Sequence, residues 1–189
     1  MQINDETFIA QKTFRALLQA MSHPGRVYSL SQESELNGLI LVLQTLLDHE
    51  VTFNVFGHQK DELEYKAIRA TGSKTANIED ADFIIIPSGN SEGVIINAKR
   101  GTLEYPDTGA TVIYSIRSLS ARDNGGLKIT LKGPGINGEI SSFLSGVSKS
   151  EFIYLKEINS EYPLGIDSVF IDSENNIMCI PRSTKIEVK

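Results

Sequence analysis

Two charged residues near the C-terminus, Asp167 and Arg182, stand at the ends of apolar segments, where they can do chemistry. Ser183 and Thr184 follow the arginine and add two hydroxyl groups. One interpretation is an ion pair, with Glu187 nearby, that locks the ends of these segments together. The other is a cleft for a phosphate or phosphonate group, because a guanidinium presents two parallel donors to such an anion. The residues alone leave both interpretations open.

The elements that position these residues are predicted to form a buried β-hairpin. Apolar residues cluster in 166–171 and again in 177–180, and the turn formers 172–176 lie between them. Pro181 cannot donate a hydrogen bond to a neighbouring strand, so it ends the second strand and turns Arg182 out of the sheet. The sequence therefore predicts an interior hairpin that ends in charged and hydroxyl groups.

The N-terminal segment is predicted to be a helix, capped by Asn4 or Asp5, that ends at 22–25. Pro24 disfavours the helical conformation at the residue before it, and the following glycine readily takes a positive φ. If this helix packs beside the hairpin, three further candidates join the rim of the Asp167 and Arg182 region. These candidates are Arg15, Ser22 and Gly25. The apolar face of the helix is predicted at i, i+3, i+4 and i+7 spacing, as Phe14, Leu17, Leu18 and Met21.

The remaining segments alternate between predicted helices and strands. Residues 36–47 are apolar on nearly all sides, with Gly38 inside, which is typical of a helix covered on more than one side. Residues 83–87 form a wholly apolar run, typical of a strand covered on both faces. Further strands are predicted at 26–30, 51–56, 110–116 and 127–131, and a helix at 62–71. This alternation predicts one layered α/β/α domain over residues 1–189, whose sheet is mixed because the closing hairpin is antiparallel.

A glycine-rich segment at 133–138 matches the GxGxxG pattern of dinucleotide-binding loops. Such a loop needs backbone N–H groups that face the pyrophosphate and a helix directly after the turn. Pro134 has no N–H group, and 139–145 is a short segment soon interrupted by Gly146. We therefore interpret this segment as a structural turn.

The histidines and the single cysteine do not form a known metal or catalytic motif. His23, His49 and His58 each lie near a predicted turn, without HxH or HExxH spacing. Cys179 is the only cysteine and lies in the second strand of the hairpin. Because it has no second cysteine to pair with, an internal disulfide and a multi-cysteine metal site are impossible within this sequence. We expect no metal site, no catalytic residue and a buried, unreactive thiol.

The charge of the chain argues against binding to nucleic acids. Its formal net charge is −6, and its longest basic run is the pair Lys99 and Arg100, whereas a nucleic-acid surface needs a basic stripe. Asp5 and Glu6 stand where a signal peptide needs a basic start, and no apolar stretch approaches the length that spans a bilayer. We expect a cytoplasmic protein that binds neither nucleic acid nor membrane.

Four blocks of the sequence resemble the PhnH family, the H subunit of the bacterial carbon–phosphorus lyase system for phosphonate breakdown. They are FRALLQAMSHPG (14–25), GTLEYPDTGAT (101–111), LKITLKGPGI (127–136), and the closing segment with PLGID and, after a turn, IPRSTKIEV. The blocks recur in order from residue 14 to residue 189. The resemblance therefore covers essentially the whole chain.

The resemblance implies a fold similar to the large domain of pyridoxal-phosphate-dependent transferases, and a homodimer that works with the G, I and J subunits. With the further L subunit, that assembly supports attachment of a phosphonate to the ribose C1 of a nucleoside triphosphate. This chain would be an accessory subunit without an active centre or cofactor. Pyridoxal phosphate needs a Schiff-base lysine, and Lys128 and Lys132 are expected to face solvent. The alternative is a free-standing enzyme or binding protein for a small phosphorylated or phosphonylated metabolite, which uses Asp167 and Arg182.

Overall fold

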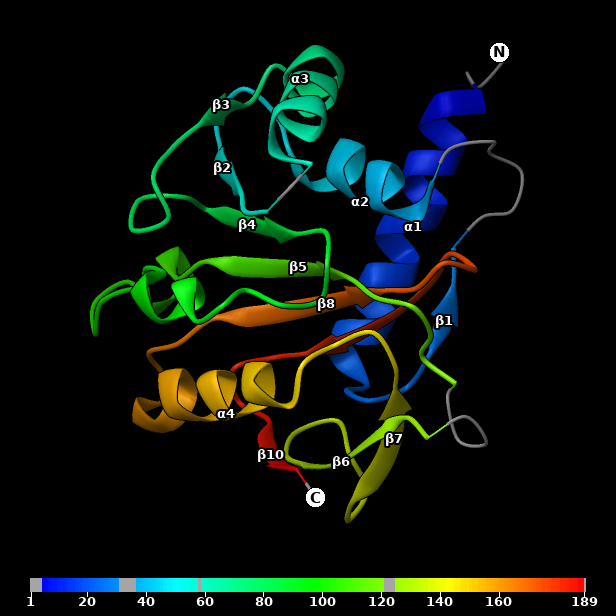
Figure 1. Ribbon diagram of the computed structural model, residues 1–189, viewed down its shortest axis with the longest axis vertical. Coiled ribbons are helices and arrows are strands. Elements are labelled where there is room, and N and C mark those ends of the chain that lie inside the picture. Colours follow the sequence, from blue (N-terminus) through cyan, green and yellow to red (C-terminus); the bar gives the residue numbers. More distant parts are fainter. Residues whose placement is uncertain (1–4, 31–36, 58, 121–124, 189) are drawn as a thin grey trace.

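A mixed sheet of seven strands runs through the middle of the molecule, and the closing hairpin forms two of them (Figure 1). The computed structural model describes residues 5–30, 37–57, 59–120 and 125–188. The strands of this sheet are β1 (Tyr28–Ser29), β2 (Thr52–Val55), β3 (Lys74–Thr75), β4 (Phe83–Ile86), β5 (Thr111–Ser115), β8 (Asp167–Ile171) and β9 (Asn176–Ile180). Their order is β1-β9-β8-β5-β4-β2-β3, with β8 parallel to β5 and antiparallel to β9. The predicted hairpin and mixed sheet are confirmed.

A smaller antiparallel sheet and several helices complete the fold. The smaller sheet has the order β10-β6-β7 and consists of β6 (Leu127–Lys132), β7 (Ile140–Leu144) and β10 (Lys185–Val188). The helices are α1 (Asp5–Ser22), α2 (Gly38–Leu46), α3 (Lys60–Thr71) and α4 (Lys149–Ile158), with 3-10 turns η1 (Val94–Asn97), η2 (Pro106–Thr108) and η3 (Asn159–Glu161). Among the described residues, none of these helices has both the length and the apolar content needed to cross a bilayer.

The two faces of the large sheet pack against different layers. Successive side chains of a strand point to opposite faces. In β4, Ile85 packs in the cluster of helices α1, α2 and α3, whereas Ile84 and Ile86 pack in the cluster of α4 and the smaller sheet. In β5, Ile113 and Tyr114 divide in the same way. The large sheet is therefore covered on both faces, as its apolar strands predict.

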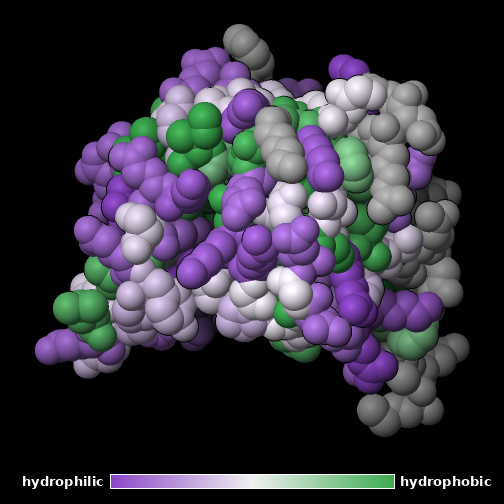
Figure 2. All heavy atoms as spheres, turned by 90° about the horizontal axis from the view of Figure 1, so that it is seen from below, coloured by the Kyte–Doolittle hydropathy of each residue, from purple (hydrophilic) through white to green (hydrophobic). Residues whose placement is uncertain are grey.

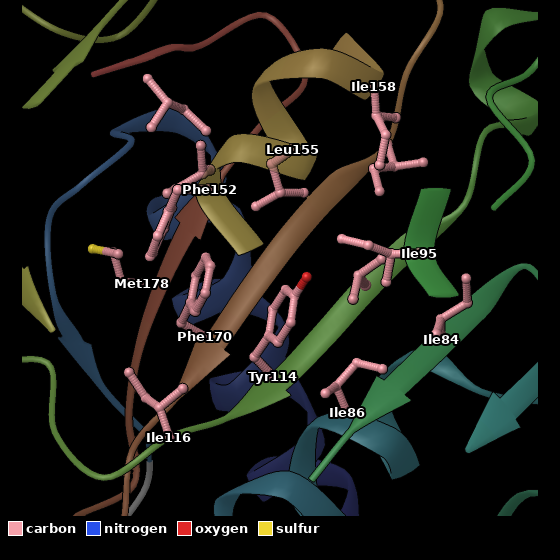
Figure 3. Packing of buried hydrophobic residues seen from close by; sticks show 14 of the residues in the cluster. Ile84, Ile86, Ile95, Tyr114, Ile116, Phe152, Leu155, Ile158, Phe170 and Met178 are labelled. Carbon is pink, nitrogen blue, oxygen red and sulfur yellow. The ribbon is translucent and has the colours of Figure 1, made fainter. Parts of the chain in front are cut away.

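Aromatic and aliphatic side chains fill the space between the large sheet and α4 (Figure 3). A carboxylate is also buried there. The ring of Phe170 stacks on those of Tyr114 and Phe152, with centroid distances of 4.9 and 5.6 Å. Glu151 is fully buried; its Oε2 accepts a hydrogen bond from the Tyr114 hydroxyl at 2.8 Å, and its Oε1 accepts from Ser91 N and Oγ, both at 3.0 Å. Burial raises the pKa of Tyr114 well above its usual value, and the Glu151 charge raises it further. The phenol therefore stays a hydrogen-bond donor.

The turn between β8 and β9 is organised by Asp172. One carboxylate oxygen accepts hydrogen bonds from the N–H groups of Glu174 and Asn176, both at 2.9 Å. The other accepts from Leu119 N and from the Asn176 side chain, both at 3.2 Å. Asn175 takes the left-handed conformation, with φ 61°, which asparagine tolerates better than most residues. These contacts explain why the predicted turn formers close a hairpin here.

Helix α1 buries a different face from the predicted one. Leu17 is buried as expected, but Phe14 and Leu18 are 46% and 49% exposed. The other fully buried side chains on this face, Thr13 and Ala20, are small, so the helix can approach β9 and α2 closely. The i, i+3, i+4 and i+7 spacing predicted the face with the largest apolar side chains. That face lies beside the buried one, which Leu17 and the small side chains form.

Two predicted elements also have different bounds. The strand predicted at 26–30 is limited to Tyr28–Ser29, which pairs only with the first residues of β9. Gly38 is the first residue of α2 rather than an interior one, and Leu36 lies outside the described residues. The N–H of Gly38 donates to Oδ1 of Asn175 at 2.7 Å, and a Cβ at this position would lie 2.8 Å from that oxygen. Gly38 thus allows a close approach between α2 and the hairpin turn.

Candidate functional site

The structure brings Asp167 and Arg182 together at the amino end of β8. Nη2 of Arg182 lies 2.6 Å from Oδ2 of Asp167, and Nε lies 3.2 and 3.3 Å from the two carboxylate oxygens. The backbone N–H of Arg182 also donates to Oδ1 at 2.8 Å. The arginine and aspartate side chains are only 12% and 24% exposed. The predicted ion pair is present, partly shielded from water.

The other donors of Arg182 hold the loop that precedes β5. Nη1 donates to the carbonyl oxygen of Pro106, and Nη2 donates to that of Gly109 at 3.4 Å. A guanidinium has five N–H groups, and these contacts together with those to Asp167 engage four of them. Glu187 takes no part in the pair, because it lies 3.7 Å from Nζ of Lys132 instead. Arg182 therefore has little capacity left for a phosphate or phosphonate group.

Close backbone packing explains the glycines around this ion pair. A Cβ on Gly109 would lie 2.4 Å from the carbonyl oxygen of Gly165 and 2.6 Å from Nη1 of Arg182. The N–H of Gly165 donates to the carbonyl oxygen of Arg100 at 3.0 Å. Sequence reasoning did not identify Pro106 and Gly109 as partners of the arginine, because a backbone carbonyl has no signature in the sequence.

Ser183 and Thr184 lie against the glycine-rich turn between β6 and β7. A Cβ on Gly133 would lie 3.1 Å from the carbonyl oxygen of Ser183, and one on Gly135 would lie 2.2 Å from that of Ser22. The turn thus contacts both Ser22, at the end of α1, and the residues after β9. A strand rather than a helix follows this turn, which confirms the structural interpretation of the GxGxxG pattern.

The remaining candidates are not joined to the Asp167 and Arg182 pair. Gly25 contacts the hairpin elsewhere, because its N–H donates to the carbonyl oxygen of Cys179 at 3.3 Å. The carbonyl oxygen of Gly25 accepts from the Ser142 hydroxyl at 2.9 Å. Arg15 is exposed on α1, and among the described residues no hydrogen bond links it to either member of the pair. The end of α1 does hold the hairpin, but through backbone contacts rather than through a shared rim.

A cleft of about 600 Å³ opens beside Arg182, between the last turn of α4 and β10. Ser183 and Thr184 line it, as the anion-site interpretation requires, together with Lys156 and Lys185. Sequence reasoning missed these two lysines, because one lies on a helix that it did not predict and the other was not singled out within the closing IPRSTKIEV block.

The two described histidines and the cysteine are in ordinary structural positions. The ring of His23 contacts the carbonyl oxygen of Gln19 at 3.1 Å, His49 is exposed, and His58 lies outside the described residues. Within the part of the chain that the structure describes, no group of three or more His, Cys, Asp or Glu side chains is placed to hold a metal ion. Cys179 is fully buried, as predicted, and burial raises the pKa of its thiol, with the Asp167 charge adding to the effect.

Comparison with known proteins places the sequence of this chain in a family. The family model described as bacterial phosphonate metabolism protein (PhnH) matches residues 2–187. A protein of Stutzerimonas stutzeri named as the C–P lyase subunit HtxG is 32% identical over 95% of this chain and 86% of its own length. The α-D-ribose 1-methylphosphonate 5-triphosphate synthase subunit PhnH of Rhizobium meliloti (strain 1021) is 27% identical over 97% of this chain and 92% of its own. The chain therefore belongs to the PhnH family of bacterial phosphonate metabolism proteins.

Proposed function

We propose that this protein is a dimeric accessory subunit of a cytoplasmic carbon–phosphorus lyase assembly with subunits of the G, I and J types. In that assembly it supports transfer of a phosphonate to the ribose C1 of a nucleoside triphosphate without catalysing the step. The observation that carries the proposal is the family match, which extends from residue 2 to residue 187 and includes relatives named as subunits.

The geometry around Arg182 supports an accessory role. Most of the N–H groups of the guanidinium point to Asp167 and to the carbonyl oxygens of Pro106 and Gly109. Contacts of this kind hold three segments of the fold together and leave the arginine poorly placed to bind a reacting phosphonate. The alternative of a free-standing enzyme that acts through Asp167 and Arg182 is therefore the less favoured one.

The lysines near the glycine-rich turn support the same proposal. Nζ of Lys132 lies 3.2 Å from Glu139, on the surface, and Nζ of Lys128 lies 5.9 Å from the ring centroid of Phe143. A Schiff-base lysine needs a site that encloses pyridoxal phosphate and positions the pyridine nitrogen. We therefore propose that the fold serves assembly rather than pyridoxal chemistry. We further propose that residues 1–189 form one domain of the pyridoxal-transferase type.

The exposed flank of α1 supports the proposed homodimer. Phe14 and Leu18 lie one helical turn apart, and about half of each side chain is exposed. Large apolar side chains that stay exposed on one face of a helix are typical of an interface. We propose that this flank contributes to contacts between two copies of the chain.

Co-expression tests the assembly proposal. An affinity-tagged copy of this chain is produced together with the G, I and J subunits of the same system, and the purified material is examined for each subunit. We expect the other subunits to copurify in fixed ratios after a high-salt wash. Recovery of this chain alone, together with turnover of a phosphonylated substrate by the isolated chain, would overturn the proposal in favour of the free-standing enzyme.

A further inference from the structure

We propose that the cleft between α4 and β10 binds a small organic phosphate or phosphonate, with its anionic group at Lys156 and Lys185 and its apolar body against the cleft wall. This site lies beside the Asp167 and Arg182 pair but uses different residues. It is formed within one chain, so the inference does not depend on the assembly proposed above.

The size and the lining of the cleft suit a small molecule with an apolar part. Its volume of about 600 Å³ falls within the range of about 300–1,000 Å³ that is usual for ligand sites. The buried side chain of Ile186 and the rings of Pro134 and Tyr162 contribute apolar surface. Tyr162 is 66% exposed, so its ring is accessible to a flat group.

The charges of the cleft differ in sign from those of the chain as a whole. The chain has a formal net charge of −6, yet three of the four charged residues that line the cleft are basic. Arg182 is neutralised by Asp167, and the one acidic residue, Glu187, lies near Lys132. Among the described residues, no ion pair engages the remaining two, Lys156 in the last turn of α4 and Lys185 at the start of β10 (Figure 1). Two cations without partners beside an apolar wall form a local positive region that attracts anions.

Hydroxyl groups offer further hydrogen bonds to an anion. Thr184 lines the cleft and is only 5% exposed, and within the described part of the chain its Oγ1 has no hydrogen-bond partner. Most buried polar groups in proteins are hydrogen-bonded, so a buried hydroxyl without a partner indicates a missing one. Ser183 adds a second hydroxyl at the same wall. Two cations and two hydroxyls match the three oxygens and the double charge of a phosphonate better than the two oxygens of a carboxylate.

The end of the molecule that carries β10 presents both polar and apolar side chains (Figure 2). The view from below in Figure 2 looks onto the end of the molecule that carries β10 and the hairpin of β6 and β7 in Figure 1, and hydrophilic side chains dominate this face. Apolar areas occur between them. A ligand with one charged end and one apolar end matches a surface of this mixed character.

Phenylphosphonate tests both halves of the proposal, because it joins a phosphonate group to a ring. The intact chain is titrated by isothermal calorimetry with phenylphosphonate, with inorganic phosphate as the anion alone, and with benzyl alcohol as the ring alone. We expect phenylphosphonate to bind at least about tenfold more tightly than either part, since each part uses only one half of the cleft. No binding of phenylphosphonate up to about 10 mM, which corresponds to a negligible affinity, would overturn the proposal.

Substitution of the lysines locates the site. The variant Lys156→Met/Lys185→Met keeps the alkyl stems and removes both charges, so we expect at least a tenfold loss of phenylphosphonate affinity. The control Lys74→Met/Lys149→Met makes the same change of charge at exposed lysines outside the cleft. It should bind as the unmodified chain does. Equal losses in the two variants would show that binding reflects overall charge rather than this cleft, and would contradict the proposal.

The hydroxyl of Thr184 provides an independent test. Thr184→Val keeps the shape of the side chain and removes a hydroxyl that has no partner, so the melting temperature without ligand should stay equal or rise. Affinity for phenylphosphonate should fall at least about tenfold, the usual effect of losing one hydrogen bond to a charged group. Unchanged affinity together with an unchanged fold would exclude this hydroxyl from the site. None of these outcomes alters copurification with the other subunits, so the two proposals can fail separately.

Discussion

Removal of the Arg182 side chain should destabilise the protein strongly, because one side chain holds three segments together. Arg182→Ala eliminates a charge-assisted contact with Asp167, worth about 1.5–3 kcal/mol. It also removes hydrogen bonds to the carbonyl oxygens of Pro106 and Gly109, worth about 0.5–1.5 kcal/mol each. Water can reach the 24% of Asp167 that is exposed and recover part of this loss. We therefore expect the free energy of unfolding to fall by about 2–4 kcal/mol.

Urea unfolding at pH 7, followed by circular dichroism, measures this change. In a chain of this size the loss corresponds to a decrease in melting temperature of about 5–15 °C. Arg182→Lys should fall between the two proteins, because an ammonium keeps the charge but cannot reach both carbonyl oxygens and the carboxylate. The matched control is Arg15→Ala, which removes an exposed arginine from α1 and should change stability by less than about 0.5 kcal/mol.

A double-mutant cycle with Asp167→Asn separates the ion pair from the carbonyl contacts. We expect a coupling energy between Asp167 and Arg182 of about 1–3 kcal/mol. A loss of stability below about 1 kcal/mol in Arg182→Ala, or a coupling energy near zero, would show that Arg182 does not hold these segments together. In that case the guanidinium would be free for an anion, and the free-standing enzyme would become the better interpretation.

Three further predictions follow from the packing. Gly135→Ala should lower the free energy of unfolding by about 3 kcal/mol or more, since its Cβ would lie 2.2 Å from a carbonyl oxygen at the end of α1. The control Gly138→Ala is also at positive φ but has no described atom within 4 Å, so it should lower the free energy of unfolding by only about 1–2 kcal/mol. Equal urea midpoints of the two variants would contradict this prediction. Tyr114→Phe leaves an oxygen of Glu151 buried without its partner and should cost about 1–3 kcal/mol at pH 7. Because the folded-state pKa of this phenol is raised, its contribution to stability is present below about pH 10 and is lost as the pH rises further. The difference in unfolding free energy between Tyr114→Phe and the unmodified protein should therefore narrow between about pH 7 and pH 11. A constant difference would be inconsistent with the assigned hydrogen bond. Phe14→Glu should weaken the dimer at least tenfold without lowering the melting temperature of the monomer, as measured by sedimentation; an unchanged dimer would remove the exposed flank of α1 from the interface.

The hairpin and the strands beside it were predictable because they depend on local signals. An unbroken apolar run identified β4, a cluster of apolar residues identified β8, and Pro181 correctly marked the end of β9. Burial on both faces needs no knowledge of distant segments, since it is visible in the composition of each strand. The face of α1 was not predictable in this way, because its closest contacts use the small side chains of Thr13 and Ala20 rather than the large ones.

The smaller sheet and α4 depend on contacts that the sequence does not display. Strand β7 contains two serines between apolar residues, and α4 carries the buried Glu151, so neither has a clean apolar pattern. The carboxylate is buried only because Tyr114 and Ser91, far away in the sequence, supply its hydrogen bonds. Such long-range compensation cannot be seen from a local pattern.

The candidate site was predictable in one half and not in the other. Asp167 and Arg182 could be paired because they flank the two strands of a single hairpin. The carbonyl oxygen of Pro106 lies 76 residues away from Arg182 in the sequence and has no signature there. Lys156 meets Lys185 at one cleft only through the packing of α4 against β10. Local reasoning therefore identified the ion pair and missed the cleft beside it.

The most direct test of the proposed accessory role is the mass of the purified particle, measured by light scattering after size exclusion, for this chain alone and mixed with the G, I and J subunits. A dimeric accessory subunit should have a mass of about 42 kDa alone, twice the 20.8 kDa of one copy, and its whole population should shift into a larger particle on mixing. A monomer of 20.8 kDa that keeps its mass in the mixture would contradict the proposed role.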